Sequence, residues 1–185
     1  MIGIKEADHV AHVGCPGDPG RFAAIANHVG ASGSVVVMVP DRTSADRTRE
    51  AATAARVPVE VQVVPLIRLP RPEASFDAVV VDDTADLFEF VRPERRRSAL
   101  GEMFRILRPG GRVIVISRQP RGGMMGALIA QASRSLVDDL HRWLPAEGFE
   151  SVRQRTTPTE LALTEGVKPL SGRKGPARPG ASPTL

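Results

Sequence analysis

The 185-residue sequence has a single cysteine, one tryptophan and no tyrosine, and aromatic residues make up only 4% of the chain. The lone cysteine, Cys15, excludes an intrachain disulfide, and no cysteines and histidines stand at the spacing of a structural zinc site. With so few aromatic rings, the core must be built from valine, isoleucine, leucine and alanine, as in buried parallel sheets. The scarcity of aromatic residues therefore favours an α/β fold.

Long apolar runs are also lacking. No run approaches the roughly 18 residues that a membrane span requires. Residues 1–6 lack the apolar region of a signal peptide. We therefore expect a cytoplasmic protein without a membrane span.

Acidic residues are missing from the last fifteen positions, which carry Arg173, Lys174 and Arg178 among Gly, Pro and Ser. Such a segment buries too little apolar surface to offset the entropy of ordering. We predict one domain over residues 1–170 and a disordered basic tail over residues 171–185. Setting aside the three cations of the tail reduces the formal net charge of +4 to near +1. A nearly neutral domain with few rings for base stacking makes nucleic acid an unexpected partner.

Short runs rich in valine and isoleucine alternate with longer helical patterns. Buried strands are predicted at residues 9–13, 34–39, 59–64, 76–81 and 112–117. Helices are predicted at residues 21–29, 44–56 and 93–107. This βαβ alternation predicts a doubly wound, mostly parallel sheet with helices on both faces.

The pattern changes after the fifth strand. A glycine-rich loop at residues 119–123 leads into a helix that extends to about Leu144. Two further strands are predicted at residues 149–155 and 159–164, and the connection between them is too short for a crossover helix. We therefore expect a C-terminal antiparallel hairpin and a sheet of about seven strands.

A glycine-rich turn at residues 13–21 joins the first strand to the first helix, at the edge where doubly wound folds bind ligands. Gly14, Gly17 and Gly20 would allow close approach of the backbone to a ligand, but their spacing suits a bare tight turn equally well. Asp18, followed by proline, is typical of a helix N-cap. An aspartate there would repel an anionic group, which disfavours a phosphate site.

Three further motifs follow this turn in order. They are Leu69-Pro70 with Ser-Phe-Asp-Ala-Val at residues 75–79, Leu-Arg-Pro-Gly-Gly-Arg-Val at residues 107–113, and Glu-Gly-Phe at residues 147–149. With these motifs the chain, from about Ala7 to Pro169, resembles the class I S-adenosylmethionine-dependent methyltransferases, in particular those acting on small molecules, quinones and lipids. The resemblance implies a Rossmann-like fold, S-adenosylmethionine as cofactor and a small-molecule acceptor.

The resemblance also implies a set of cofactor contacts along the glycine-rich turn. These fall on His12, Gly14, Cys15, Gly17 and Gly20. In the family, three acids contact the amine, the ribose and the adenine, and the matching positions here hold His12, Val39 and Pro65. Asp41 would reach the ribose if its loop bends back, and would otherwise cap the next helix. On a buried strand, His12 would otherwise be a satisfied core residue.

Asp82 and Asp83 end the fourth strand, in the region that faces the methyl group and the acceptor in the family. Asp82 is a candidate cofactor contact and a candidate general base, although carboxylates at strand ends also cap or stay solvated. The four arginines within residues 92–97 are interpreted as a solvated helix face, with an anionic binding patch as the alternative. We expect no metal.

Two functions remain open. The first is an S-adenosylmethionine-dependent methyltransferase acting on an unidentified small molecule, in which positioning the methyl group in line with a nucleophile supplies much of the catalysis. The second is a catalytically degenerate, methyltransferase-like binding or scaffold subunit, indicated by the three missing acids. Because the chain begins almost at its first strand, we expect an open site that a homo- or hetero-oligomer completes.

Overall fold

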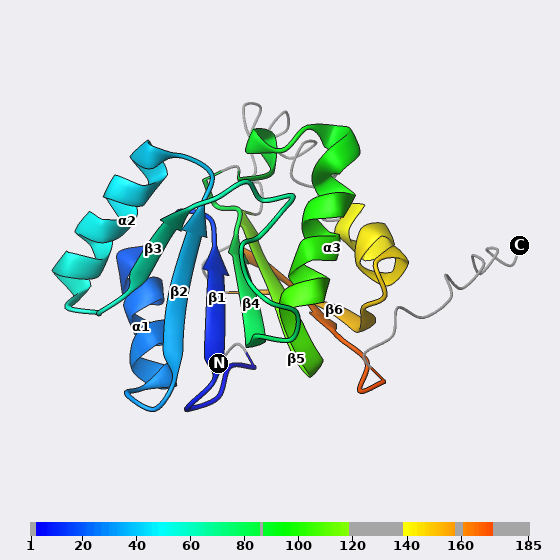
Figure 1. Cartoon of the computed structure of the whole chain (residues 1–185), viewed down its shortest axis with the longest axis horizontal. Helices are drawn as coiled ribbons and strands as arrows, with labels where there is room; N and C mark the ends of the chain where they lie inside the picture. Colours follow the sequence, from blue (N-terminus) through cyan, green and yellow to red (C-terminus); the bar gives the residue numbers. More distant parts are fainter. Residues whose placement is uncertain (1–2, 86, 119–138, 158–160, 172–185) are drawn as a thin grey trace, which may run out of the picture.

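The computed structural model describes residues 3–85, 87–118, 139–157 and 161–171, which form a seven-stranded sheet flanked by helices (Figure 1). The strands are β1 (His9–Val13), β2 (Ser34–Val39), β3 (Glu60–Val63), β4 (Phe76–Asp82), β5 (Leu107–Arg118), β6 (Glu150–Thr156) and β7 (Leu161–Val167). The helices are α1 (Pro19–Val29), α2 (Arg42–Ala55) and α3 (Arg96–Ile106), with short 3-10 turns η1 (Leu87–Phe90) and η2 (Pro93–Arg95).

The order of the strands across the sheet is β3-β2-β1-β4-β5-β7-β6. The first five are parallel to one another, and β7 pairs antiparallel with both β5 and β6. The predicted mostly parallel sheet with its C-terminal antiparallel hairpin is therefore confirmed. The order reverses between β1 and β4, and sheets of this type bind ligands at the carboxyl ends of the strands beside that point.

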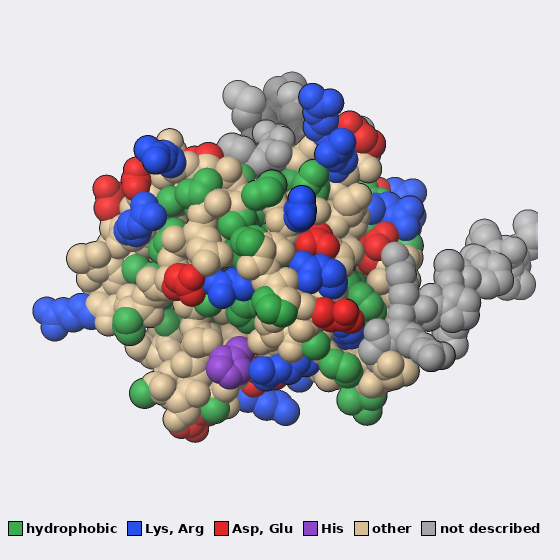
Figure 2. Space-filling view, in the orientation of Figure 1, with side chains coloured by type: hydrophobic (Ala, Val, Ile, Leu, Met, Phe, Trp, Pro, Cys, Tyr) green, Lys and Arg blue, Asp and Glu red, His purple; other side chains and the backbone are tan. Residues whose placement is uncertain are grey.

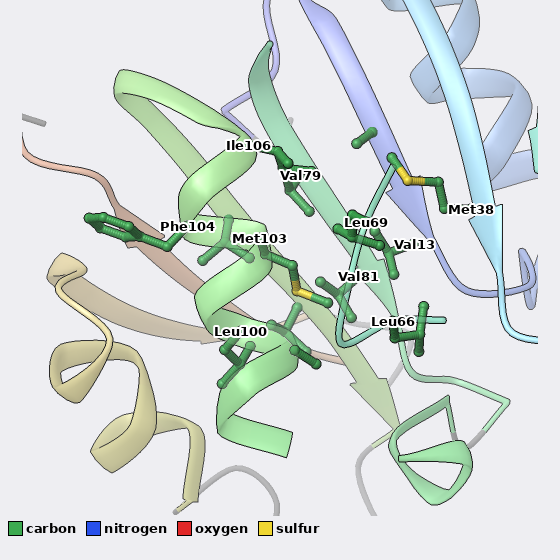
Figure 3. Close-up of a cluster of buried hydrophobic side chains, with 14 of the residues drawn as sticks. Val13, Met38, Leu66, Leu69, Val79, Val81, Leu100, Met103, Phe104 and Ile106 are labelled. Atoms are coloured by element: carbon green, nitrogen blue, oxygen red, sulfur yellow. The ribbon is translucent and has the colours of Figure 1, made fainter. Parts of the chain in front are cut away.

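Both faces of the sheet are buried, which explains the nearly continuous runs of valine and isoleucine in its strands. Successive residues of β1 point to opposite layers. Val10 packs in a cluster with Phe22 of α1, whereas Val13 packs in a second cluster with Leu100 and Met103 of α3. Figure 3 shows this second cluster between α3 and the sheet. Each large apolar side chain that becomes fully buried contributes about 1.5–3 kcal/mol, so these two layers hold the strand ends in place.

The predicted bounds of β1 and β2 match the structure, but β5 begins five residues earlier than expected. Leu107 already pairs with β4, and the chain then bulges over residues 108–111 before regular pairing resumes. Gly110 has a φ of +79°, and a side chain at Gly111 would lie 2.9 Å from two backbone oxygens. The glycines of the motif at residues 107–113 therefore form a bulge within β5, whereas the sequence predicts a strand that starts only after them.

Some predicted features lie outside the described residues. They are the glycine-rich loop at residues 119–123, most of the helix after it, and the basic tail beyond Ser171. The described end of that helix covers residues 139–146, and its Leu140 and Leu144 are fully buried. Within the part of the chain that the structure describes, no helix has the length and apolar character needed to cross a membrane.

Candidate functional site

The glycine-rich turn after β1 packs directly on the segment that follows β4. Gly14 has a φ of +102°, and a side chain there would lie 2.5 Å from the carbonyl oxygen of Asp82. A Cβ at Gly17 would lie only 1.9 Å from the Thr84 hydroxyl oxygen. Gly14 thus allows the close approach of two backbone segments, and Gly17 leaves room for the Thr84 side chain, so that the turn lies on Asp82 at the switch point of the sheet.

The Asp82 carboxylate is the centre of this contact and is only 1% exposed. Its Oδ2 accepts hydrogen bonds from the Gly17 N–H (3.2 Å) and from the Arg21 guanidinium (2.8 Å). Its Oδ1 accepts from the Thr84 N–H (3.1 Å) and from the Thr84 hydroxyl. A buried carboxylate is costly unless it is paired and hydrogen-bonded, and these four donors satisfy it.

The groups around Asp82 set its protonation. Burial on its own raises the pKa of Asp82, but a protonated His12, the Thr84 hydroxyl and the Arg21 guanidinium together outweigh burial and hold the pKa below its usual value. A carboxylate with a lowered pKa is a weak general base at neutral pH. The lowered pKa therefore disfavours general-base catalysis by Asp82, and its contact with a cofactor stays a prediction.

His12 lies beneath the turn and is 1% exposed. Its Nε2 is 4.0 Å from Asp82 Oδ2, its Nδ1 is 3.3 Å from the Gly14 carbonyl oxygen, and its ring packs edge-on against Phe22. Burial lowers the pKa of His12 more strongly than the nearby Asp82 raises it. The ring is therefore neutral at pH 7, where Arg21 supplies the positive charge that Asp82 needs. His12 has the packing of a satisfied core residue, and its contact with a cofactor stays a prediction.

This buried histidine makes the stability of the fold sensitive to pH. Since the pKa of folded His12 lies below the unfolded value of 6.5, the unfolded chain takes up the proton first, and stability falls as pH drops below 6.5. We expect His12→Gln to flatten this dependence. Urea unfolding from about pH 7.5 to about pH 5 measures it, with the exposed His141→Gln as control. An unchanged slope in His12→Gln contradicts the assignment, because Asp82 loses its stabilising charge only below about pH 4.

Cys15 and Gly20 take part in local contacts. The Thr48 hydroxyl donates to the Cys15 sulfur at 3.9 Å, and burial raises the pKa of this half-buried thiol. The Gly20 N–H donates to the Asp18 carboxylate at 2.7 Å, within the N-cap that the sequence predicts for α1. Their contacts with a cofactor stay predictions.

Asp41 caps α2. Its Oδ1 accepts from the Ser44 N–H at 2.9 Å and its Oδ2 from the Ser44 hydroxyl at 2.8 Å, and these bonds lower the pKa of Asp41. The capping alternative is therefore confirmed, and a ribose contact stays a prediction. Val39 is fully buried, and its carbonyl accepts from the Val64 N–H at 2.9 Å. At two of the positions where the family has an acid, this chain thus has the apolar side chains of Val39 and Pro65.

Asp83 directly follows β4. It is 7% exposed, its Oδ1 accepts from the Phe88 N–H at 2.9 Å, and its backbone N–H donates to Ile116 at 2.8 Å. Asp83 therefore fixes the start of η1. Within the described ranges, no three His, Cys, Asp or Glu side chains come together in a way that could hold a metal ion.

Sequence reasoning missed Arg21 and Thr84, which complete the Asp82 site. Arg21 stands in the first turn of α1, where the positive end of the helix dipole disfavours a cation. A cation at the start of a helix needs a compensating acid nearby. The position of Arg21 in the sequence is therefore the signal that could have predicted its pairing with an acid. Thr84 carries no comparable signal, because its role depends on the chain doubling back after β4.

The strand order and the switch point define a doubly wound α/β protein, and the glycine-rich turn contacts Asp82 at the carboxyl ends of β1 and β4, where sheets of this type bind ligands. Residues 11–115 match the methyltransferase domain family, and the chain belongs to this family. The resemblance found in the sequence is therefore confirmed.

Two curated relatives are both named demethylmenaquinone methyltransferase. The one from Clavibacter sepedonicus is 34% identical over 143 residues, covering 62% of this chain and 56% of the relative. The one from Deinococcus radiodurans is 34% identical over 84 residues, covering 45% of this chain and 33% of the relative. The chain thus spans about half the length of its relatives or less.

Solved structures share the fold. A methyltransferase from Aquifex aeolicus that depends on S-adenosylmethionine superposes with a TM-score of 0.70 at 18% identity, over 90% of this chain and 85% of that one. A putative methyltransferase, solved in complex with the Haloferax volcanii Trm112 methyltransferase activator, superposes with a TM-score of 0.67 at 15% identity, over 91% of this chain and 86% of that one. At these identities the likeness shows the fold alone.

Proposed function

We propose that the chain is an S-adenosylmethionine-dependent methyltransferase acting on a small molecule. The observation that carries the proposal is the contact between the glycine-rich turn and Asp82 at the switch point of the sheet. Membership of the methyltransferase domain family supports it. The names of the two curated relatives make a quinone-type acceptor the first to assay.

The described residues fit the cofactor through one carboxylate. Asp82 holds the Arg21 guanidinium, whose side chain is 18% exposed and can therefore leave into solvent. In this proposal the ammonium group of the cofactor takes the place of Arg21 on Asp82. The bound cofactor supplies the electrophilic methyl group, while the turn and Asp82 hold and orient the cofactor. Because Val39 and Pro65 have apolar side chains, backbone groups and Asp41 would bind the ribose and the adenine.

Calorimetric titration with S-adenosylmethionine and S-adenosylhomocysteine tests this function. Asp82→Asn is expected to weaken binding by about tenfold or more, because a charge-assisted hydrogen bond is lost. Asp77→Asn is the matched control: Asp77 lies at the other end of β4 and also pairs with an arginine, Arg108, at 2.7 Å. It is expected to change affinity by less than about twofold, since it lies outside the site.

The outcomes separate two claims. Equal binding by the wild type and Asp82→Asn would show that Asp82 does not hold the ligand. Failure of the wild type to bind either compound at millimolar concentration would rule out a self-sufficient methyltransferase.

A binding or scaffold subunit is the second candidate function. It is favoured because His12, Val39 and Pro65 provide no carboxylate and because Arg21 already occupies Asp82. A partner chain, a second copy or another protein, would then complete the open site. The putative methyltransferase solved with the Trm112 activator is an example of this fold in complex with a partner protein. Tight binding of S-adenosylhomocysteine by the isolated chain contradicts it.

A further inference from the structure

A surface cavity of about 380 Å³ lies on the sheet where β5, β7 and β6 run side by side. Its charged lining residues are Arg112 of β5, Glu165 of β7, and Arg153 and Arg155 of β6. The volume lies within the range of roughly 300–1,000 Å³ that is usual for small-molecule pockets. The cavity shares no lining residue with the site around Asp82, which lies at the carboxyl end of β4.

The cavity lies on the more open face of β7. Successive residues of a strand point to opposite faces of the sheet. Ala162 and Thr164 are fully buried on one face, whereas Glu165 and Val167 are half-buried on the other. Arg153 pairs with Glu165 across the two strands and therefore stands on this more open face. The surface so formed lies beside β6, the edge strand of the sheet (Figure 1).

A shift in the register of β6 places both of its arginines on this face. The pairing with β7 shifts by one residue between Glu150 and Arg153, so that Arg153 lies opposite Glu165. Unshifted pairing would set Arg153 opposite the buried Thr164, because a shift of one residue moves every side chain that follows to the other face. The bulge therefore turns Arg153 and, two residues on, Arg155 toward the cavity.

The cavity carries an excess of positive charge. Arg112 pairs with Glu165 at 3.5 Å, and Glu165 is the one acid among the described lining residues. Arg153 and Arg155 are exposed, and among the described residues neither forms an ion pair. Over the face that Figure 2 shows, arginine and lysine side chains lie among aspartate and glutamate side chains. The two arginines of β6 therefore leave a cavity whose positive charge needs an anion from outside the chain.

We propose that this cavity binds a small molecule that carries a diphosphate group. Residues two apart on one strand have Cα atoms roughly 6.6 Å apart, so the long side chains of Arg153 and Arg155 can converge on adjacent phosphoryl groups. Each guanidinium offers paired N–H donors that suit phosphate oxygens. A diphosphate satisfies both unpaired cations, whereas a single carboxylate would leave one of them without a partner. The site is separate from the Asp82 site and does not depend on the proposed function.

Calorimetric titration of the full chain with pyrophosphate and with orthophosphate tests the proposal. Pyrophosphate is expected to bind at least about tenfold more tightly than orthophosphate. The double variant Arg153→Gln/Arg155→Gln is expected to weaken pyrophosphate by about tenfold or more. The double variant Arg49→Gln/Arg142→Gln is the control, because it removes the same charge from two exposed arginines that each pair with an acid. It is expected to change the affinity by less than about twofold.

A change of opposite sign is expected at Glu165. Glu165→Gln removes the acid of the lining and frees Arg112, so pyrophosphate is expected to bind several-fold more tightly. Equal binding of the two phosphates, or an equal loss in both double variants, overturns the diphosphate site. If hexaglutamate binds more tightly than pyrophosphate and loses its affinity in Arg153→Gln/Arg155→Gln, the surface fits an acidic protein segment and the proposal is overturned. The affinity for S-adenosylhomocysteine is expected to stay unchanged in that variant, which separates this site from the proposed function.

Discussion

Replacement of Lys168 by methionine is expected to lower the free energy of unfolding by about 2–4 kcal/mol, because a buried cation bound to two carbonyls is removed. Lys168 follows β7 and is 2% exposed. Its ammonium donates to the carbonyls of Phe104 (2.9 Å) and Leu107 (2.7 Å) and lies 4.6 Å from the centre of the Phe104 ring. It thereby caps the C-terminus of α3, where helix carbonyls have no partner of their own.

Methionine keeps the apolar stem of this side chain, one atom shorter, but takes the ammonium donor away from both carbonyls. Urea unfolding measures the difference, and Lys5→Met, at an exposed position, is the control for loss of one positive charge. If the urea midpoint of Lys168→Met equals that of Lys5→Met within experimental error, the bonds from the ammonium to the two carbonyls do not stabilise the fold.

The second large effect is expected at Gly17. A Cβ there would lie 1.9 Å from the Thr84 hydroxyl oxygen, which is itself bound to Asp82. Gly17→Ala is therefore expected to push the turn away from β4 and to cost about 1–3 kcal/mol, as overpacking does. Gly20→Ala is the control, since its nearest neighbour would be the Asp18 oxygen at 3.2 Å.

A double-mutant cycle identifies the cause of this loss. Thr84→Ala removes the hydroxyl that the new methyl group would meet, so Gly17→Ala is expected to be less damaging in that background than in the wild type. Unfolding midpoints of the four proteins give the coupling. Strict additivity would show that the loss comes from the backbone of the turn rather than from the clash with Thr84.

The sheet could be predicted because its strands are buried on both faces. Residues 34–39 show no alternation of polar and apolar side chains, which is typical of a central parallel strand. The predicted bounds of this strand were correct. The start of β5 was wrong because glycines interrupt its pattern, although pairing with β4 begins at Leu107. The sequence shows only that glycines interrupt the run. The register between β4 and β5 is needed to show that these glycines form a bulge within β5.

The site was less predictable than the sheet. Position along the chain was enough to bring Gly14, Gly17 and Asp82 together, because strand ends at a switch point meet. It did not reveal that Arg21, 61 residues away, satisfies Asp82, since the pairing depends on where one long side chain reaches. The C-terminal cap by Lys168 was missed for the same reason.

A crystal structure of the protein with S-adenosylhomocysteine tests the central claim most directly. The ligand is expected at the carboxyl ends of β1 and β4, with its ammonium on Asp82 and the 2.8 Å bond from Arg21 to Asp82 broken. A ligand bound elsewhere, or bound while Arg21 remains on Asp82, would contradict the exchange of cations on which the proposed cofactor site depends.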